Sequence, residues 1–394
     1  MAKLGECFSV IRNGASIRQT DGAGGFPITR IETIADKTIN REKFGYAGIY
    51  DLAQYRDYIL QDGDILMSHI NSEKYLGKVA LYSKQDDEQI IHGMNLLMLR
   101  ADTQKVIPEY AKYYFESQKF LRQIGRITKK SVNQASFTVT ALKELEIPLA
   151  SIIVQRDISE KLKKVDWLVS LRKQQLAKLD ELVKARFVET FGDMLLNSLG
   201  WSEKPLECLA DIVSGITKGR KTTETDLQEV PYMAVSNVKN GYIDWTTVKT
   251  ILATRQEIEQ YRLLPDDILM TEGGDPDKVG RGAIIKNPLE NSIHQNHIFR
   301  VRLDESELLP SFFAEYLQHQ KAKRYFLGCA KQTTGIASIN MRQLKSLPVL
   351  LPPLSLQNEF AAFVERVDQQ KQTVQQSLEK LELMKKALMQ EYFG

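Results

Sequence analysis

Two stretches of the chain carry apolar residues at alternating steps of four and three, the pattern of a helix that buries a narrow seam against another helix. The seam positions are, in the first stretch, Ile158, Leu162, Val165, Val169, Arg172, Leu176, Leu179, Val183 and Arg186, and in the second, 202 residues later, Phe360, Val364, Val367, Lys371, Val374, Leu378, Leu381, Lys385 and Leu388. Because both stretches keep this register throughout, the pattern predicts two long helices that pair as a coiled coil.

Four charged residues interrupt the seam, namely Arg172, Arg186, Lys371 and Lys385, and each has an aliphatic residue at the position 202 residues away. Polar residues at seam positions usually fix the register and the partner of a helix at some cost in stability. A helix over 158–191 would be about 50 Å long at roughly 1.5 Å per residue. If the region between the two helices is compact, the second helix has to run back along the first. We therefore expect an antiparallel pair.

The repeat extends beyond the helices. Glu6-Cys7 corresponds to Glu207-Cys208, and Asp64-Ile65-Leu66-Met67 corresponds to Asp267-Ile268-Leu269-Met270. Residues 1–150 and 197–352 therefore read as two diverged copies of one head, and 151–196 and 353–394 as the two helices. The expected fold class is α+β, with two mixed α/β heads joined by two long antiparallel coiled-coil helices in a pseudo-twofold arrangement.

Local patterns predict elements within each head. Alternating or continuous apolar runs predict strands over 79–82, 96–99, 230–235 and 283–285. Two helical patterns, over 108–124 and 310–327, each open with a proline suited to the first turn. We expect Trp167 and Trp201, which flank the first long helix, to be packing residues.

Composition narrows the class of protein. The formal net charge is +3, which neither requires nor excludes a nucleic-acid partner. The three cysteines form no Cys-x-x-Cys pair, and His294 and His297 have no apparent third ligand, so we expect no metal site. No apolar run approaches the roughly 18 residues of a membrane span, so a cytoplasmic protein is expected. There is no Asp/Glu-x-Lys tripeptide of metal-dependent nucleases, and the chain is not expected to be an enzyme.

The order of the duplicated motifs resembles the specificity subunit of a type I restriction-modification system. The matching segments are Ser214-Gly215-Ile216-Thr217-Lys218-Gly219-Arg220, Gly63-Asp64-Ile65-Leu66, Asp267-Ile268-Leu269, Leu351-Pro352-Pro353-Leu354 and Gln357. The resemblance covers nearly the whole chain. The first copy departs from the pattern, because Ile147-Pro148-Leu149-Ala150-Ser151 lacks the double proline and Arg12-Asn13-Gly14 replaces the lysine-rich loop.

This resemblance implies that residues 1–150 and 197–352 are target recognition domains, each reading one half of a bipartite double-stranded DNA target. The helices would set the spacing of the half-sites and dock two modification subunits, which methylate adenine, and restriction subunits would join them. S-adenosylmethionine, ATP and Mg are expected in the partner subunits and no cofactor in this chain. The alternatives are a coiled-coil scaffold with protein-binding heads and an enzyme with an unrecognised site.

Candidate DNA contacts are polar and basic residues in loops at matching places of the two heads. In the second head they are Lys218, Arg220, Lys221, Thr222, Lys278, Arg281, Lys331 and Thr333, and in the first head His69, Asn71, Lys74, Lys78, Lys129 and Lys130. Cations and hydroxyls beside a flexible glycine suit contacts to phosphates or to a guanine edge. The competing interpretation of each loop is an ordinary solvated surface turn.

Overall fold

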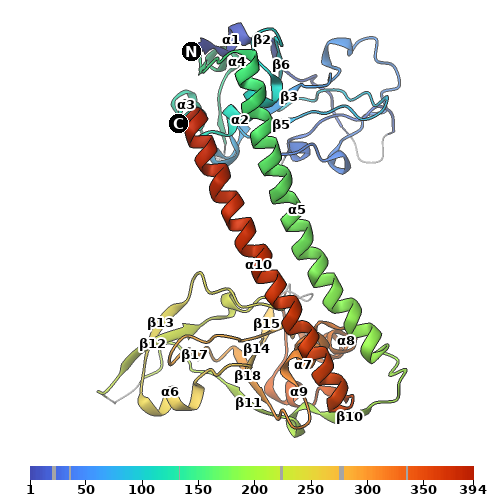
Figure 1. The fold of residues 1–394 in the computed structure, drawn as a ribbon, viewed down its shortest axis with the longest axis vertical. Helices are drawn as coiled ribbons and strands as arrows, with labels where there is room; N and C mark the ends of the chain where they lie inside the picture. Colours follow the sequence, from blue (N-terminus) through green and yellow to red (C-terminus); the bar gives the residue numbers. More distant parts are fainter. Residues whose placement is uncertain (20–23, 35–36, 133, 222–224, 275–278, 334–335) are drawn as a thin grey trace. The chain divides into compact units, whose positions relative to one another are not determined.

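The structure is a computed structural model that describes residues 1–394 except 20–23, 35–36, 133, 222–224, 275–278 and 334–335. The chain divides into two compact units. The first unit comprises Met1–Lys173 and Gln376–Gly394, and the second comprises Gln174–Gln375. Each unit holds one head together with one part of each of two long helices, α5 and α10, drawn in green and red in Figure 1.

The predicted pair of long helices is confirmed. Helix α5 is Ile152–Phe191 and α10 is Leu354–Phe393, each 40 residues long. All eighteen predicted seam positions are buried or half-buried. Among them Ile158, Leu162, Val165 and Leu378 are buried in the first unit, and Leu179, Val367 and Val374 in the second, whereas Leu176, Val364 and Leu381 are half-buried. The heptad pattern therefore located the buried faces of both helices.

Within each unit the two helices run antiparallel. In the first unit Lys385 contacts Asp166 at 2.5 Å, and Arg172 donates a hydrogen bond to Ser377 at 3.1 Å. In the second unit Lys371 contacts Asp180 at 2.6 Å, and the Phe191 ring lies 5.4 Å from the Phe360 ring. In both units a higher number on α5 faces a lower number on α10. Three of the four charged seam residues thus pair with polar groups of the facing helix, whereas Arg186 pairs with Glu189 of its own helix.

The first head is built on a four-stranded antiparallel sheet in the order β2-β6-β3-β5, with a smaller sheet in the order β4-β8-β7. Its elements are β1 Ala2–Lys3, α1 Leu4–Cys7, β2 Phe8–Asn13, β3 Ile65–Ser68, β4 Ile70–Asn71, β5 Val79–Leu81, β6 Leu96–Ala101, α2 Pro108–Glu116, α3 Gln118–Ile127, β7 Lys129–Lys130, β8 Ala135–Ser136, α4 Val139–Lys143 and β9 Glu146–Ile147. Its core also includes Ile158, Leu162 and Phe393 of the long helices. The head and its helix ends therefore share one hydrophobic core.

The second head repeats this plan. Its sheets have the orders β11-β18-β14-β16 and β15-β20-β19, and a further sheet, β13-β12-β17, belongs to this head. Its elements are β10 Ser202–Pro205, β11 Ala210–Ser214, β12 Gln228–Met233, β13 Lys249–Ala253, α6 Arg255–Tyr261, β14 Ile268–Thr271, β15 Gly273–Gly274, β16 Gly282–Ile284, β17 Ile293–His294, β18 Ile298–Leu303, α7 Pro310–Gln318, α8 Gln320–Cys329, β19 Lys331–Thr333, β20 Ile336–Ser338, α9 Met341–Lys345 and β21 Pro348–Leu351.

The two main sheets also agree in register. Ile65 of β3 pairs with Leu99 of β6, and the residues about 202 positions later, Ile268 and Val301, pair in the same way. The duplicated mixed α/β heads predicted from the sequence are confirmed. The predicted strands are present as β5, β6, β12 and β16, with ends that differ by at most two residues.

Two details of the sequence interpretation are wrong. The helices predicted over 108–124 and 310–327, the edge helices of the two heads, are each two helices. Ser117 and His319 adopt extended backbone angles, and their side chains cap the second helix of each pair. Trp201 is half-buried and donates its indole N–H to Phe191, as a packing residue would, but Trp167 is 58% exposed. Its ring is therefore not a packing residue within the described part of the chain.

Candidate nucleic-acid interface

In the first head the small sheet brings the predicted contact residues together. Asn71 of β4 lies opposite Ala135 of β8, and Ala135 lies opposite Lys130 of β7. Lys129 is paired in the next row of the same sheet. Residues that are about 60 positions apart in the sequence thus share one short surface, which we name the first rim (Asn71, Lys74, Lys78, Lys129 and Lys130).

The first rim is positively charged. The ammonium groups of Lys74 and Lys78 lie 4.7 and 4.2 Å from the centre of the Tyr75 ring. Lys130 pairs with Glu73 at 2.8 Å, and both side chains are more than half exposed. An exposed ion pair of this kind contributes little to stability and exchanges readily for another anion. Four lysines beside one exposed acid are suited to phosphate contacts along a nucleic-acid backbone.

His69 belongs to the same strand connection but is 6% exposed and lies edge-on to Phe137. Burial lowers the pKa of His69 to about 4, so the ring is neutral near pH 7. Its Nδ1 has no hydrogen-bond partner among the described residues. The burial weighs against the direct DNA contact predicted for His69 and favours a supporting role behind the first rim.

The corresponding surface of the second head is formed by β15, β20 and β19. Gly273 lies opposite Ser338, which lies opposite the exposed Lys331. Arg281 is half-buried, and its Nε has no hydrogen-bond partner in the part of the chain that the structure describes. The predicted contacts Thr222 and Lys278, and the side chain of Thr333, lie outside the described residues.

The cations of the loop that follows β11 lie in two different environments. Arg220 forms an ion pair with Glu257 of α6 and donates to the Leu252 carbonyl at 3.2 Å, and the guanidinium lowers the pKa of Glu257. Lys218 and Lys221 are exposed, and the described residues supply no ion pair for either of them. Arg220 therefore anchors the loop to α6, which weighs against its predicted DNA contact, and the two lysines remain available.

One polar pair at the second head was not predicted. Glu272 follows β14 and His297 precedes β18, and the carboxylate lies 2.6 Å from the His297 Nδ1. Thr271 and Ile298 pair across these two strands, which makes Glu272 and His297 neighbours. A carboxylate and an imidazole on the same surface can accept from and donate to base edges. The sequence contained both residues, but only the strand pairing shows that they meet.

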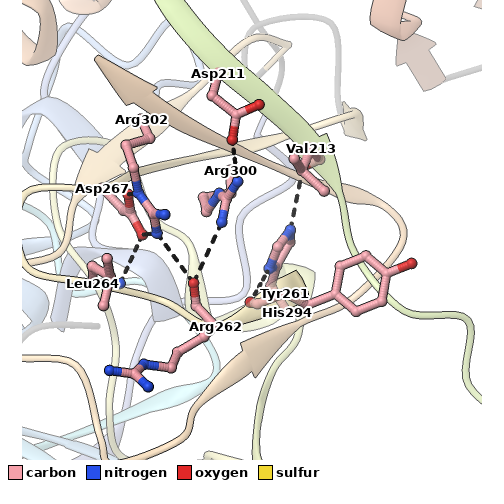
Figure 2. Close-up of polar contacts among 9 residues, drawn as sticks. All are labelled: Asp211, Val213, Tyr261, Arg262, Leu264, Asp267, His294, Arg300 and Arg302. Atoms are coloured by element: carbon pink, nitrogen blue, oxygen red, sulfur yellow. Dashed lines mark hydrogen bonds and ion pairs between the residues drawn. The ribbon is translucent and has the colours of Figure 1, made fainter. Parts of the chain in front are cut away.

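A polar network holds the opposite ends of these paired strands, and Figure 2 shows it in the second head. Arg302 makes two bonds of 2.8 Å to Asp267 and one of 3.2 Å to the Arg262 carbonyl. The first head has the same arrangement, in which Arg100 binds Asp64 at 2.8 and 2.7 Å and the Ile59 carbonyl at 3.2 Å. Since both copies keep it, this ion pair belongs to the shared scaffold.

Two further groups are buried beside this network. The first head has a buried histidine, His92, at the position of His294, but no counterpart of Arg300. Arg300 is 4% exposed and pairs with Asp211, whereas Met98 occupies the matching strand position of the first head. His294 lies between the carbonyls of Val213 and Tyr261, at 3.3 and 3.2 Å (Figure 2). Burial lowers the pKa of His294 to about 4. The neutral ring donates to only one of the two carbonyls.

Within the described residues, no three His, Cys, Asp or Glu side chains are grouped as a metal site requires. The described helices also include none that is long and apolar enough to cross a membrane.

Comparison with known proteins connects this arrangement to one family. The family model described as the type I restriction modification DNA specificity domain matches residues 1–181 and again 199–383. The MjaX specificity subunit of a type I restriction enzyme of Methanocaldococcus jannaschii is 29% identical over 98% of this chain and 91% of its own length. The StySPI specificity subunit of Salmonella potsdam is 25% identical over 66% of this chain, which spans 58% of that relative.

Solved structures share the fold. The S subunit of a type I restriction-modification system from M. genitalium matches all of this chain and 95% of its own, with a TM-score of 0.58 at 15% identity. A chain from a structure of complex assembly in the type I R-M system matches all of this chain and 96% of its own, with a TM-score of 0.56 at 17% identity. The same order of heads and long helices thus occurs in both structures.

Proposed function

Because the chain belongs to the type I restriction-modification DNA specificity family, whose model matches it twice, we propose that each head reads one half of a bipartite DNA target. In this role the chain supplies sequence recognition and no catalysis. S-adenosylmethionine, ATP and Mg are used by the partner subunits. We place the complex in the cytoplasm, where its DNA target lies.

The observation that carries this proposal is one scaffold with two different surfaces. Both heads keep the sheet register and an Arg–Asp ion pair at the strand ends opposite these surfaces. In contrast, the first rim is formed by lysines, and the second head places the Glu272–His297 pair after the equivalent strand. Two heads that recognise different base sequences need different side chains at the base edges, while the fold that positions these side chains can stay the same. This pattern therefore favours two distinct half-sites.

The long helices carry the second part of the proposal, which is the docking of two modification subunits. In the first unit Trp167 is 58% exposed and Leu171, one turn further along α5, is 38% exposed. Both lie on the face of α5 opposite its seam. Exposed aromatic and aliphatic groups on a polar helix mark a protein-binding surface. Restriction subunits join the complex through these modification subunits or beside them.

The test exchanges one head. Residues 198–345 are replaced by those of a relative with a known different target, and the chimera is expressed with its modification subunits. Methylation mapping of genomic DNA is expected to show one half of the target changed and the other half retained. A change in both halves, or in neither, would contradict independent reading by the two heads. If the parent complex does not bind DNA in a salt-dependent way, the scaffold alternative is favoured.

A further inference from the structure

Tyr113 of α2 lies at a junction of three helices in the first unit. Its hydroxyl donates a hydrogen bond to Asp166 of α5 at 3.0 Å. The second oxygen of Asp166 contacts the ammonium group of Lys385 of α10 at 2.5 Å. Tyr113 is only 4% exposed, and burial together with Asp166 raises the pKa of its hydroxyl, so that it stays protonated as a donor.

Further charges close the junction. Lys112 lies 4.2 Å from the centre of the Tyr113 ring and 3.2 Å from Glu116, and Lys385 lies 3.8 Å from Glu116. Two cations, two carboxylates and a phenol from α2, α5 and α10 therefore contact one another. The side chain of Glu116 is 8% exposed, and those of Asp166 and Lys385 about 30%. The junction is thus shielded from the solvent that weakens surface ion pairs.

The need for charge here is not explained by stability. Val183, 202 residues before Lys385, is buried in the seam of the second unit, and apolar residues usually stabilise such a position at least as well as an ion pair. Directional polar contacts differ from apolar ones in another respect, because they specify register and orientation. The hydrogen bond and ion pair on Asp166 tie the head helix α2 to both long helices in one rotational setting.

The described residues of the second unit do not repeat this set. Glu315 occupies the position 202 residues after Tyr113, and burial raises the pKa of its carboxyl group. As a carboxylate it accepts but cannot donate as Tyr113 does. Lys371 of the second unit pairs with Asp180 of α5 at 2.6 Å, and it lies 3.7 Å from Asp368, the counterpart of Asp166, on its own helix. The connection from head helix through Asp166 to Lys385 is therefore a feature of the first unit.

We propose that Tyr113, Asp166 and Lys385 are positioning residues that fix the first head on its helix pair and thereby determine which gaps between half-sites are accepted. This inference rests on the proposed function. Successive base pairs differ by about 34° in twist and 3.4 Å in rise, since a helical turn of about 34–36 Å holds 10–10.5 base pairs. A head that can rotate and shift by this amount could bind its half-site in DNA whose gap is one base pair longer or shorter.

The experiment compares Lys385→Met and Tyr113→Phe with the parent complex on DNA libraries in which the two half-sites are separated by the parent gap or by one base pair more or less. Both variants are expected to keep the half-site sequences. Methylation at the neighbouring gaps, relative to the parent gap, is expected to rise roughly three- to tenfold, because the loss of one hydrogen bond changes an equilibrium constant by about that factor. Lys385→Arg keeps the charge and is expected to restore discrimination.

Lys173→Met is the matched control, because Lys173 contacts Glu382 at 3.3 Å between the same two helices, with both side chains more than half exposed. It is expected to leave gap preference unchanged, and an equal broadening by this variant would overturn the inference. So would unchanged gap preference in both junction variants. If Lys385→Met fails to fold, Tyr113→Phe, which removes one hydroxyl, still decides the question. If the parent complex methylates no bipartite target, the proposed function itself fails.

Discussion

Gln357 makes in the second unit the same three backbone hydrogen bonds that Gln155 makes in the first. The amide oxygen of Gln155 accepts from the Ile107 N–H at 2.9 Å, and its nitrogen donates to Lys105 and Ala150, each at 2.9 Å. The corresponding bonds of Gln357 involve Leu309, Glu307 and Pro352, at 2.8, 3.1 and 2.9 Å. Both side chains are fully buried. Each glutamine joins a long helix to the loop that precedes the first edge helix of its head.

The first prediction concerns this anchor. Gln155→Met and Gln357→Met preserve side-chain volume but leave one N–H and two carbonyls without partners. Each substitution is expected to lower the free energy of unfolding by about 2–4 kcal/mol. Urea denaturation measures the loss, and hydrogen exchange at the Ile107 or Leu309 amide locates it. Gln372→Met, at an exposed position of α10, is the control and is expected to change stability by less than about 0.5 kcal/mol.

The duplicated architecture could be predicted because period and spacing are local properties of the sequence. A burial pattern of four and three residues already specifies the buried face of a helix, and a shared offset of 202 identifies Gln155 and Gln357 as equivalents. The break at Ser117 was missed because the apolar pattern continues across it, and only the capping hydrogen bond shows the change of direction.

The candidate site was less predictable because its contacts depend on partners far away in sequence. The sequence favours Arg220 as a phosphate ligand, but in the structure it pairs with Glu257, 37 residues later. Glu272 and His297 meet only because β14 and β18 pair antiparallel. In contrast, Lys129 and Lys130 are exposed, as phosphate contacts require, and their contact with DNA stays a prediction.

A second prediction uses the buried His294. Its folded-state pKa of about 4 lies below the ordinary value of 6.5, so the unfolded chain binds a proton that the folded chain does not. The stabilisation is fully present above pH 6.5 and is lost as the pH falls from 6.5 through 4, by up to about 3 kcal/mol. Urea unfolding between pH 7.5 and 4.5 is expected to show a smaller pH dependence for His294→Gln.

A third prediction separates the two kinds of cation in the loop after β11. Replacing Lys218 and Lys221 by alanine is expected to weaken DNA binding by the assembled complex and to reduce the slope of log K against log salt by about one unit for each lost phosphate contact. Arg220→Ala is expected to loosen the loop from α6 and to lower stability, because Glu257 loses its partner. Titrations at several salt concentrations measure the slope. A slope unchanged in the double lysine variant would place this loop away from the DNA backbone.

The same measurement applies to the first rim. Alanine at Lys74, Lys129 and Lys130 is expected to reduce the salt slope without changing the methylated sequence, since phosphate contacts position a protein but do not specify bases.

Glu272→Gln, in the second head, is expected to have the opposite effect: it relaxes the sequence preference in one half of the target and leaves the salt slope unchanged. Methylation mapping and salt titration of the two variants distinguish these effects. If Glu272→Gln left both half-sites as strict as before, Glu272 would not be a base reader.

The last prediction treats the long helices as the element that sets the gap. Four residues are added between Leu179 and Asp180 of α5 and four between Leu381 and Glu382 of α10, which lengthens each helix by about 6 Å and nearly preserves the side-chain phase. In the pair Asp180–Lys371 only Asp180 lies after an insertion point, and in the pair Asp166–Lys385 only Lys385 does. Both of these pairs therefore shift by the same four residues and can form together in one new register, whereas the Arg172–Ser377 hydrogen bond lies between the insertion points, does not shift and is expected to be lost.

An insertion in α5 alone shifts the first of these pairs and leaves the second unchanged, so the two units would require different registers and the seam would be disturbed. The double insertion is expected to give an active complex whose target gap is longer by one to two base pairs, at about 3.4 Å each, with both half-sites retained. The single insertion is expected to lose activity or stability. Methylation mapping of both variants measures the gap, and an active double-insertion complex with its original gap would show that the helices only dock partners.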